Sequence, residues 1–207
     1  MIITYYGKQF FKLQLGDIVM AVNPVSKSSK LEGTRFGADI CLISANHPDY
    51  NGGENMNYGD KVAFVINGPG EYEIKGISIF GVGVEVPFEK KKFVNTSYCL
   101  ELDGIKLGIL GVLPGKQAPG NVKETLSGVD ILFAPVSLEG LSPRDAYALA
   151  SSFEPKVIIP CDYTSETIKT FLKEAGADSS DKLDKLTVKR KDLEGKDGEV
   201  ILLSPVS

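Results

Sequence analysis

The chain has 207 residues, of which 43% are hydrophobic and 24% charged, and its formal net charge is −4. This length suits one domain over residues 1–207 with a sizeable core, and the composition excludes a disordered or fibrous chain. The negative balance argues against a general attraction for nucleic acid, which depends on a clustered positive field.

The chain carries no sign of a membrane span or of export. No apolar run reaches the roughly 18 residues needed to cross a bilayer, and the first residues are typical of a strand rather than of a signal peptide. The three cysteines, Cys41, Cys99 and Cys161, are widely spaced and form no C-x-x-C pair. We therefore expect a cytoplasmic protein without a membrane partner.

The first third of the chain is predicted to be mainly strands. Residues 2–6, 10–15 and 18–22 are apolar segments separated by glycine-containing turns, and they predict an antiparallel meander. Residues 38–44 form a short apolar run bounded by polar residues, as in a fully buried strand. The loop 45–50 follows the carboxyl end of that strand, a usual position for functional residues in layered α/β folds.

The middle of the chain continues as strands, expected at residues 63–66, 71–74, 77–84, 98–102 and 106–110. Asp103-Gly104 supplies the positive φ angles of a two-residue hairpin turn. Helices then alternate with buried strands. We expect helices over residues 121–126, 142–152 with Ser142 as N-cap, and 165–175, strands at 131–136 and 157–160, and a closing hairpin from 188–190 and 199–203.

A strand meander followed by alternating strands and helices predicts an α/β fold with two sheets and helices on their outer faces. The order of the segments resembles the metallo-β-lactamase superfamily, in particular the branch that includes ascorbate-6-phosphate lactonase and related metal-dependent hydrolases. The resemblance covers nearly the whole chain, and its most specific part is the glycine-rich turn and strand at residues 68–76. Further similar segments are residues 5–13, 22–24, 38–44, 110–111 and 155–160.

The resemblance implies a four-layer αββα sandwich with an active site at one edge, between the sheets. The family pattern H-x-H-x-D-H provides most of the first metal-binding loop there. Two bound divalent ions lower the pKa of a bridging water and polarise the electrophile that the resulting hydroxide attacks.

The chain departs from this pattern at the ligand positions. In the loop 45–50 the first and last histidines are replaced by Ala45 and Tyr50, which leaves His47 and Asp49. The bridging aspartate is replaced by Val112 and the final histidine by Asp162. Because the chain contains a single histidine, no shift of register restores a site with several imidazoles.

Two interpretations of the remaining polar residues stay open. In the first, residues 47–49 form a structured turn, no cofactor is expected, and the protein is a non-catalytic or ligand-binding member of the family. In the second, His47, Asp49 and Asp162 hold one zinc or manganese ion at low occupancy. His47 and Asp49 are then the candidate catalytic residues of a hydrolase acting on a lactone, a phosphodiester or RNA.

The expected partner is a small molecule or a protein. An RNA-binding function is a third hypothesis, because residues 182–196 contain six lysines and arginines. Three acidic residues interrupt this stretch, so a solvated face is the favoured interpretation. Cys161, next to the expected ligand position, is a further candidate nucleophile whose activation needs a nearby base.

Overall fold

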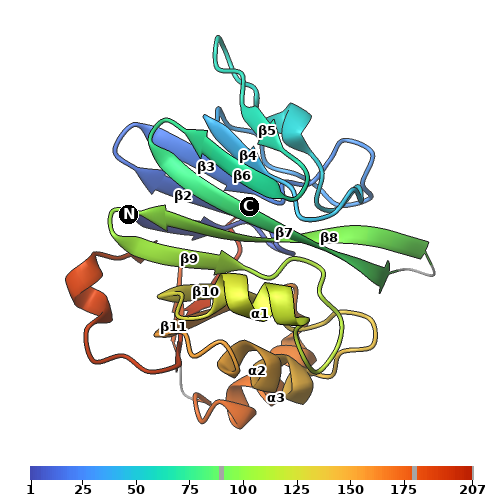
Figure 1. Cartoon of the computed structure of the whole chain (residues 1–207), viewed down its shortest axis with the longest axis vertical. Coiled ribbons are helices and arrows are strands. Elements are labelled where there is room, and N and C mark those ends of the chain that lie inside the picture. The colour runs from blue at the N-terminus through green and yellow to red at the C-terminus, as the bar shows by residue number, and fades with distance from the viewer. Residues whose placement is uncertain (89–90, 179–180, 207) are drawn as a thin grey trace.

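Two β-sheets pack face to face in the computed structural model, which describes residues 1–88, 91–178 and 181–206. The strand order is β13-β1-β2-β3-β4-β5 in the first sheet and β14-β11-β10-β9-β8-β7-β6 in the second. Figure 1 shows the two sheets as neighbouring layers, with the helices beyond the second sheet. The chain therefore has the α/β sandwich architecture of the metallo-β-lactamase fold.

The bounds of the elements are as follows. The first sheet contains β1 (Ile2–Tyr5), β2 (Phe11–Leu15), β3 (Ile18–Val22), β4 (Ile40–Leu42), β5 (Phe64–Ile66) and β13 (Leu186–Thr187). The second contains β6 (Gly70–Ile74), β7 (Ile77–Phe88), β8 (Lys91–Leu102), β9 (Ile105–Ile109), β10 (Ile131–Pro135), β11 (Val157–Cys161) and β14 (Glu199–Val200). The helices are α1 (Gly120–Leu126), α2 (Pro143–Ser151), α3 (Ser165–Glu174) and the 3-10 turns η1 (Gly53–Met56) and η2 (Arg190–Leu193).

Both sheets combine antiparallel and parallel pairing, and the parallel strands bring several loops together at one edge of each sheet. Strands β1, β2 and β3 form the predicted antiparallel meander, and β3, β4 and β5 then run parallel. In the second sheet β9, β10 and β11 run parallel. Parallel strands end at the same edge of their sheet, so the loops after β3 and β4 lie together, as do those after β9 and β11.

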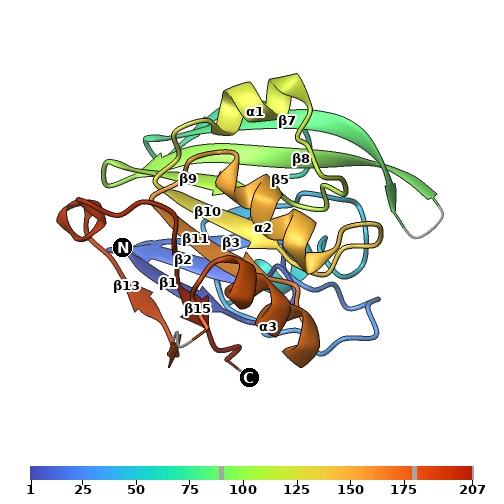
Figure 2. The ribbon, with the colours of Figure 1, turned by 90° about the horizontal axis from the view of Figure 1, so that it is seen from below.

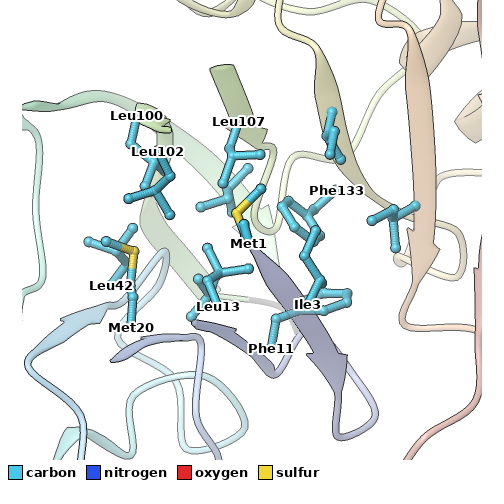
Figure 3. Packing of buried hydrophobic residues seen from close by; sticks show 14 of the residues in the cluster. Met1, Ile3, Phe11, Leu13, Met20, Leu42, Leu100, Leu102, Leu107 and Phe133 are labelled. Carbon is cyan, nitrogen blue, oxygen red and sulfur yellow. The ribbon is translucent and has the colours of Figure 1, made fainter. Parts of the chain in front are cut away.

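The main core lies between the sheets. Alternate side chains of β1, β2 and β3, such as Ile3, Phe11 and Met20, face residues of the second sheet such as Leu107 and Phe133 (Figure 3). Burial of apolar side chains of this size contributes about 1.5–3 kcal/mol each. The burial of these side chains therefore explains how the two sheets are held together.

The two outer faces are covered differently. Helices α1, α2 and α3 lie over the strands of the second sheet (Figure 2), where their apolar residues form a second buried cluster with those of β10 and β11. On the other side, a third cluster joins β3 and β4 to Met56 of η1 and to Phe36 in a loop. The outer layer of the first sheet is thus built from a loop and a 3-10 turn in the described chain.

The local signals of the sequence explain several element boundaries. The Ser142 side chain accepts a hydrogen bond from the Asp145 N–H and Pro143 begins α2, as predicted for this N-cap. Asp103 and Gly104 both have positive φ angles in the turn between β8 and β9, which confirms the predicted hairpin. Within the described residues, no helix combines the length and apolar character needed to cross a membrane.

The predicted C-terminal hairpin is wrong. Leu186 and Thr187 of β13 pair with β1, whereas β14 pairs in parallel with β11. The segments do meet in a short sheet, but there β12 (Lys182–Leu183) and β15 (Leu202–Leu203) pair in parallel, which a hairpin cannot do. The reason is that Val188 belongs to the core between the sheets and Val200 to the cluster under the helices, so each segment completes a different layer.

Candidate functional site

The loops that follow β4 and β11 meet at the edge between the sheets. The hydroxyl of Tyr50, in the loop after β4, donates a hydrogen bond to Asp162 Oδ2 over 2.9 Å. Asp162 follows β11 directly, so this bond joins one sheet to the other. The structure therefore brings together two of the positions at which the family resemblance expects metal ligands.

The Asp162 carboxylate is buried and both of its oxygens have partners. Only 6% of the residue is exposed. The Lys8 ammonium lies 3.2 Å from Oδ1, while Tyr50 occupies Oδ2. A buried carboxylate is costly unless it is paired and hydrogen-bonded, and these two partners meet that requirement.

Lys8 reaches Asp162 because the turn between β1 and β2 is fixed beside it. The Asp162 N–H donates to the Lys8 carbonyl oxygen over 2.6 Å, and the Tyr5 hydroxyl donates to the same oxygen over 2.9 Å. Lys8 and Asp162 have φ angles of 51° and 48°, values that residues other than glycine rarely adopt. The contacts between the two residues hold both in this unfavourable conformation.

Three residues at positions where the resemblance expects metal ligands are part of an apolar core. Ala45, Tyr50 and Val112 are all buried and belong to the cluster under the helices. Burial and the negative charge of Asp162 raise the pKa of Tyr50, so its phenol stays protonated and acts as a donor. The neutral edge formed by these side chains differs from the imidazoles and carboxylates that two divalent ions require.

His47 and Asp49 lie in a tight turn. The Asp49 N–H donates to His47 Nδ1 over 3.2 Å, and the Tyr50 N–H donates to the His47 carbonyl oxygen over 2.8 Å. The Asp49 carboxylate accepts a hydrogen bond of 2.5 Å from the Ser29 hydroxyl. The Asp49 carboxylate is therefore hydrogen-bonded to the loop after β3, whereas the Asp162 carboxylate is bound by Lys8 and Tyr50.

A cleft of about 400 Å³ opens beside this turn. It is lined by His47, Pro48 and Asp49, by Lys8, and by residues 28–31 of the loop after β3. Lys8 therefore contacts the buried Asp162 and also lines the cleft. The two halves of the candidate site, the buried carboxylate and the open cleft, meet at this lysine.

The buried side-chain amide of Asn95 fixes the turn that follows β9. Asn95 of β8 accepts a hydrogen bond from the Val112 N–H and donates one to the Leu110 carbonyl oxygen, over 2.8 and 3.0 Å. Gly111, between them, has a φ angle of 69°, and a Cβ atom there would lie 2.3 Å from Asn95 Oδ1. The turn after β9 is therefore fixed in a shape that only glycine accommodates.

Cys161 does not have the properties of an activated nucleophile. It is fully enclosed in the core between the sheets, where burial and the nearby Asp162 raise the pKa of its thiol well above the usual value. A thiol attacks as its thiolate, so a raised pKa makes it inert at neutral pH. Cys161 serves as an apolar core side chain.

The donor set does not fit the two-ion centre of the family. Over residues 1–88, 91–178 and 181–206, no three His, Cys, Asp or Glu side chains are grouped closely enough to hold a metal ion. The one-ion site of His47, Asp49 and Asp162 therefore stays a prediction. Any ion there would have to displace the Tyr50 and Lys8 contacts of Asp162.

Comparison with known proteins establishes the family. A family model described as the beta-lactamase superfamily domain matches residues 2–162, so the chain belongs to this family. No match was found among the curated proteins. The matched region includes every residue of the candidate site named above.

Solved structures that are named as metal-dependent hydrolases have the same fold. One is described as a Zn-dependent hydrolase of the metallo-beta-lactamase superfamily from Thermotoga maritima; it is 25% identical, with a TM-score of 0.74 over 98% of this chain and 97% of that one. A second, described as a metal-dependent hydrolase from Parabacteroides distasonis, is 17% identical with a TM-score of 0.68, covering 99% and 93% of the two chains. A metallo hydrolase from Ignicoccus hospitalis is 15% identical with a TM-score of 0.61, covering 100% and 96%.

No functional role was assigned to Lys8 or Asn95 from the sequence. Their roles depend on contacts between segments far apart in the chain, such as the 2.8 Å bond from Val112 to Asn95. One local signal was available for Lys8. It follows Gly7 in the turn after the first strand, and a charged residue in such a turn often lies at the edge of a sheet.

Proposed function

We propose that this protein is a non-catalytic member of its family that binds a small molecule at the edge between the sheets. The observation that carries the proposal is the burial of Ala45, Tyr50 and Val112 in one apolar cluster. Alanine and valine cannot ligate, and the protonated phenol of Tyr50 is already bonded to Asp162. A pair of divalent ions would find too few ligands in this arrangement.

The cleft supports the ligand-binding part of the proposal. Small-molecule sites are concave and combine apolar walls with a few polar groups that fix orientation. The cleft of about 400 Å³ has this composition, with Pro48 and Leu31 beside lysine, serine and histidine side chains. Its volume falls in the range of about 300–1,000 Å³ that is usual for such sites.

Metal analysis tests the proposal directly. Protein purified without chelators is expected to contain no tightly bound pair of ions when zinc and manganese are measured by mass spectrometry. The matched variant is Tyr50→Phe, which removes the hydroxyl that occupies Asp162 and adds no metal ligand, so its metal content should equal that of the unchanged protein. Two tightly held equivalents of zinc or manganese in the unchanged protein would reject the proposal.

A one-ion hydrolase is the second candidate. The observation that favours it is the placement of His47 and Asp49 on the same cleft as Lys8, whose ammonium contacts Asp162. Its test is a panel of lactone, phosphodiester and RNA substrates with added manganese or zinc. Turnover that disappears in His47→Ala would support this function, whereas turnover that persists would show that another site is responsible.

A further inference from the structure

The cleft beside Lys8 is lined by cationic and hydroxyl side chains from two loops. Lys8 comes from the turn between β1 and β2, and Ser28, Ser29 and Lys30 come from the loop after β3. The Ser29 hydroxyl already donates to Asp49. Lys8, Ser28 and Lys30 are therefore the donors open to a ligand, and the two lysines carry a positive charge. Ammonium and hydroxyl groups gathered around a concave surface are suited to phosphate and carboxylate oxygens.

Two carboxylates lie near these donors, and both accept hydrogen bonds. Asp162 has a partner on each oxygen, Lys8 and Tyr50. Asp49 accepts a short hydrogen bond from the Ser29 hydroxyl. No carboxylate among the described residues is within ion-pair distance of Lys30. The Lys30 ammonium is therefore available to a ligand.

Lys8 is held in place, and its contact with Asp162 leaves N–H donors of the ammonium for a ligand. An ammonium has three N–H donors, and 38% of the Lys8 side chain is exposed. Its left-handed backbone is maintained by the bonds from Asp162 and Tyr5 to its carbonyl oxygen. Residues kept in such conformations by their surroundings are found at ligand clamps, where the strain keeps a group oriented before binding.

We propose that this cleft binds a small organic molecule through an oxyanion group, a phosphate or a carboxylate, held by the ammonium groups of Lys8 and Lys30. The inference rests on the proposed function, since it names the class of ligand for that site. Ser28 contributes a hydroxyl donor, and Pro48 and Leu31 contact the apolar part of the ligand. The site recognises its ligand without a metal ion.

The experiment is calorimetric titration of the full chain, stripped of metal with a chelator and exchanged into a buffer of low ionic strength. Inorganic phosphate and acetate are titrated separately, so that the two arms distinguish a phosphate ligand from a carboxylate ligand. We expect saturable binding of at least one of them that weakens as salt is added, because the cleft is open to solvent. In Lys30→Gln the affinity should fall about tenfold, the typical loss for one charge-assisted hydrogen bond.

The matched control is Lys106→Gln, because Lys106 lines a different hollow bounded by β7, β8 and β9. Its affinity should equal that of the unchanged protein. Lys8→Gln should weaken binding as well, but it also removes the partner of Asp162, so the exposed Lys30 carries the test. Absence of saturable binding to both anions, or equal binding by Lys30→Gln and Lys106→Gln, overturns the inference.

Metal content separates this inference from the proposed function. A chain that holds no pair of ions and binds neither anion would contradict only the oxyanion site. A chain that holds two equivalents of metal would contradict the proposed function, whatever the stripped protein binds. Nuclear magnetic resonance shifts that follow phosphate or acetate should map to residues 28–31 and Lys8, and shifts confined to other regions would also reject the site.

Discussion

Replacing Tyr50 with phenylalanine isolates the hydrogen bond that joins the two sheets at the candidate site. Phenylalanine keeps the buried ring and removes only the hydroxyl that donates to Asp162 over 2.9 Å. Tyr50 is 1% exposed and Asp162 6%, so water cannot readily take the place of the lost donor. A hydrogen bond to a buried charged group contributes about 1.5–3 kcal/mol, which predicts a fall of about 2 kcal/mol in the free energy of unfolding.

Urea denaturation and calorimetry at neutral pH measure this loss. For a chain of this size, a loss of about 2 kcal/mol lowers the melting temperature by about 4–8 °C. Tyr58→Phe is the control, because Tyr58 is 72% exposed and its substitution should change stability by no more than about 0.5 kcal/mol. If Tyr50→Phe were as stable as Tyr58→Phe, the Tyr50 hydroxyl would not be what satisfies the buried carboxylate.

Three further substitutions test other parts of the fold. Gly111→Ala should lower the free energy of unfolding, measured by urea denaturation, by about 2–4 kcal/mol, because its Cβ would clash with Asn95. The control is Gly140→Ala, which has a φ angle of 82° but no atom within 4 Å of the added Cβ. It should lose about half as much. Val112→Asp should lose about 3 kcal/mol or more through its buried, unpaired charge, and a stability equal to that of Val112→Ala would refute this. Hydrogen bonds from Lys75, the Val19 N–H and Lys61 outweigh the burial of Asp39 and lower its pKa from 3.8 to about 2. The lowered pKa stabilises the fold above pH 3.8, and this contribution is lost as the pH falls towards 2; because the lysines are half exposed, we expect about 1 kcal/mol, and an unchanged acid unfolding curve for Asp39→Asn would contradict it.

The sequence predicted the central architecture because its signals there are local. The meander of β1, β2 and β3 follows from short apolar segments between turns, and the pairings confirm it. The helix beginning after Ser142 and the hairpin at Asp103-Gly104 each depend on a few adjacent residues. Such features are fixed by backbone conformation and capping, which adjacent residues determine.

The C-terminal segments could not be placed from the sequence, because their partners lie far away in the chain. Val188 bonds to Met1 through its N–H, and Glu199 pairs with Val157. Short apolar segments of two or three residues fit a hairpin or two separate sheet edges equally well. Which sheet edge each segment pairs with is decided by parts of the chain that lie far from it in the sequence.

The contacts of the candidate site could not be predicted from the sequence. The sequence identified Ala45, Tyr50, Val112 and Asp162 as replacements of metal ligands through the family resemblance. It gave no indication that Tyr50 donates to Asp162 or that Lys8 pairs with it, since these contacts join residues 112 and 154 positions apart. A contact of this kind depends on how the two sheets are set against each other.

The burial of Ala45, Tyr50 and Val112 has an evolutionary consequence. Each position now contributes packing to the cluster under the helices, so exchanging any one of them for a polar ligand removes that contribution at once. A dinuclear centre needs several ligands present together. Under the proposed function, single substitutions from this sequence towards a dinuclear centre therefore lower the stability of the fold before a pair of ions can bind.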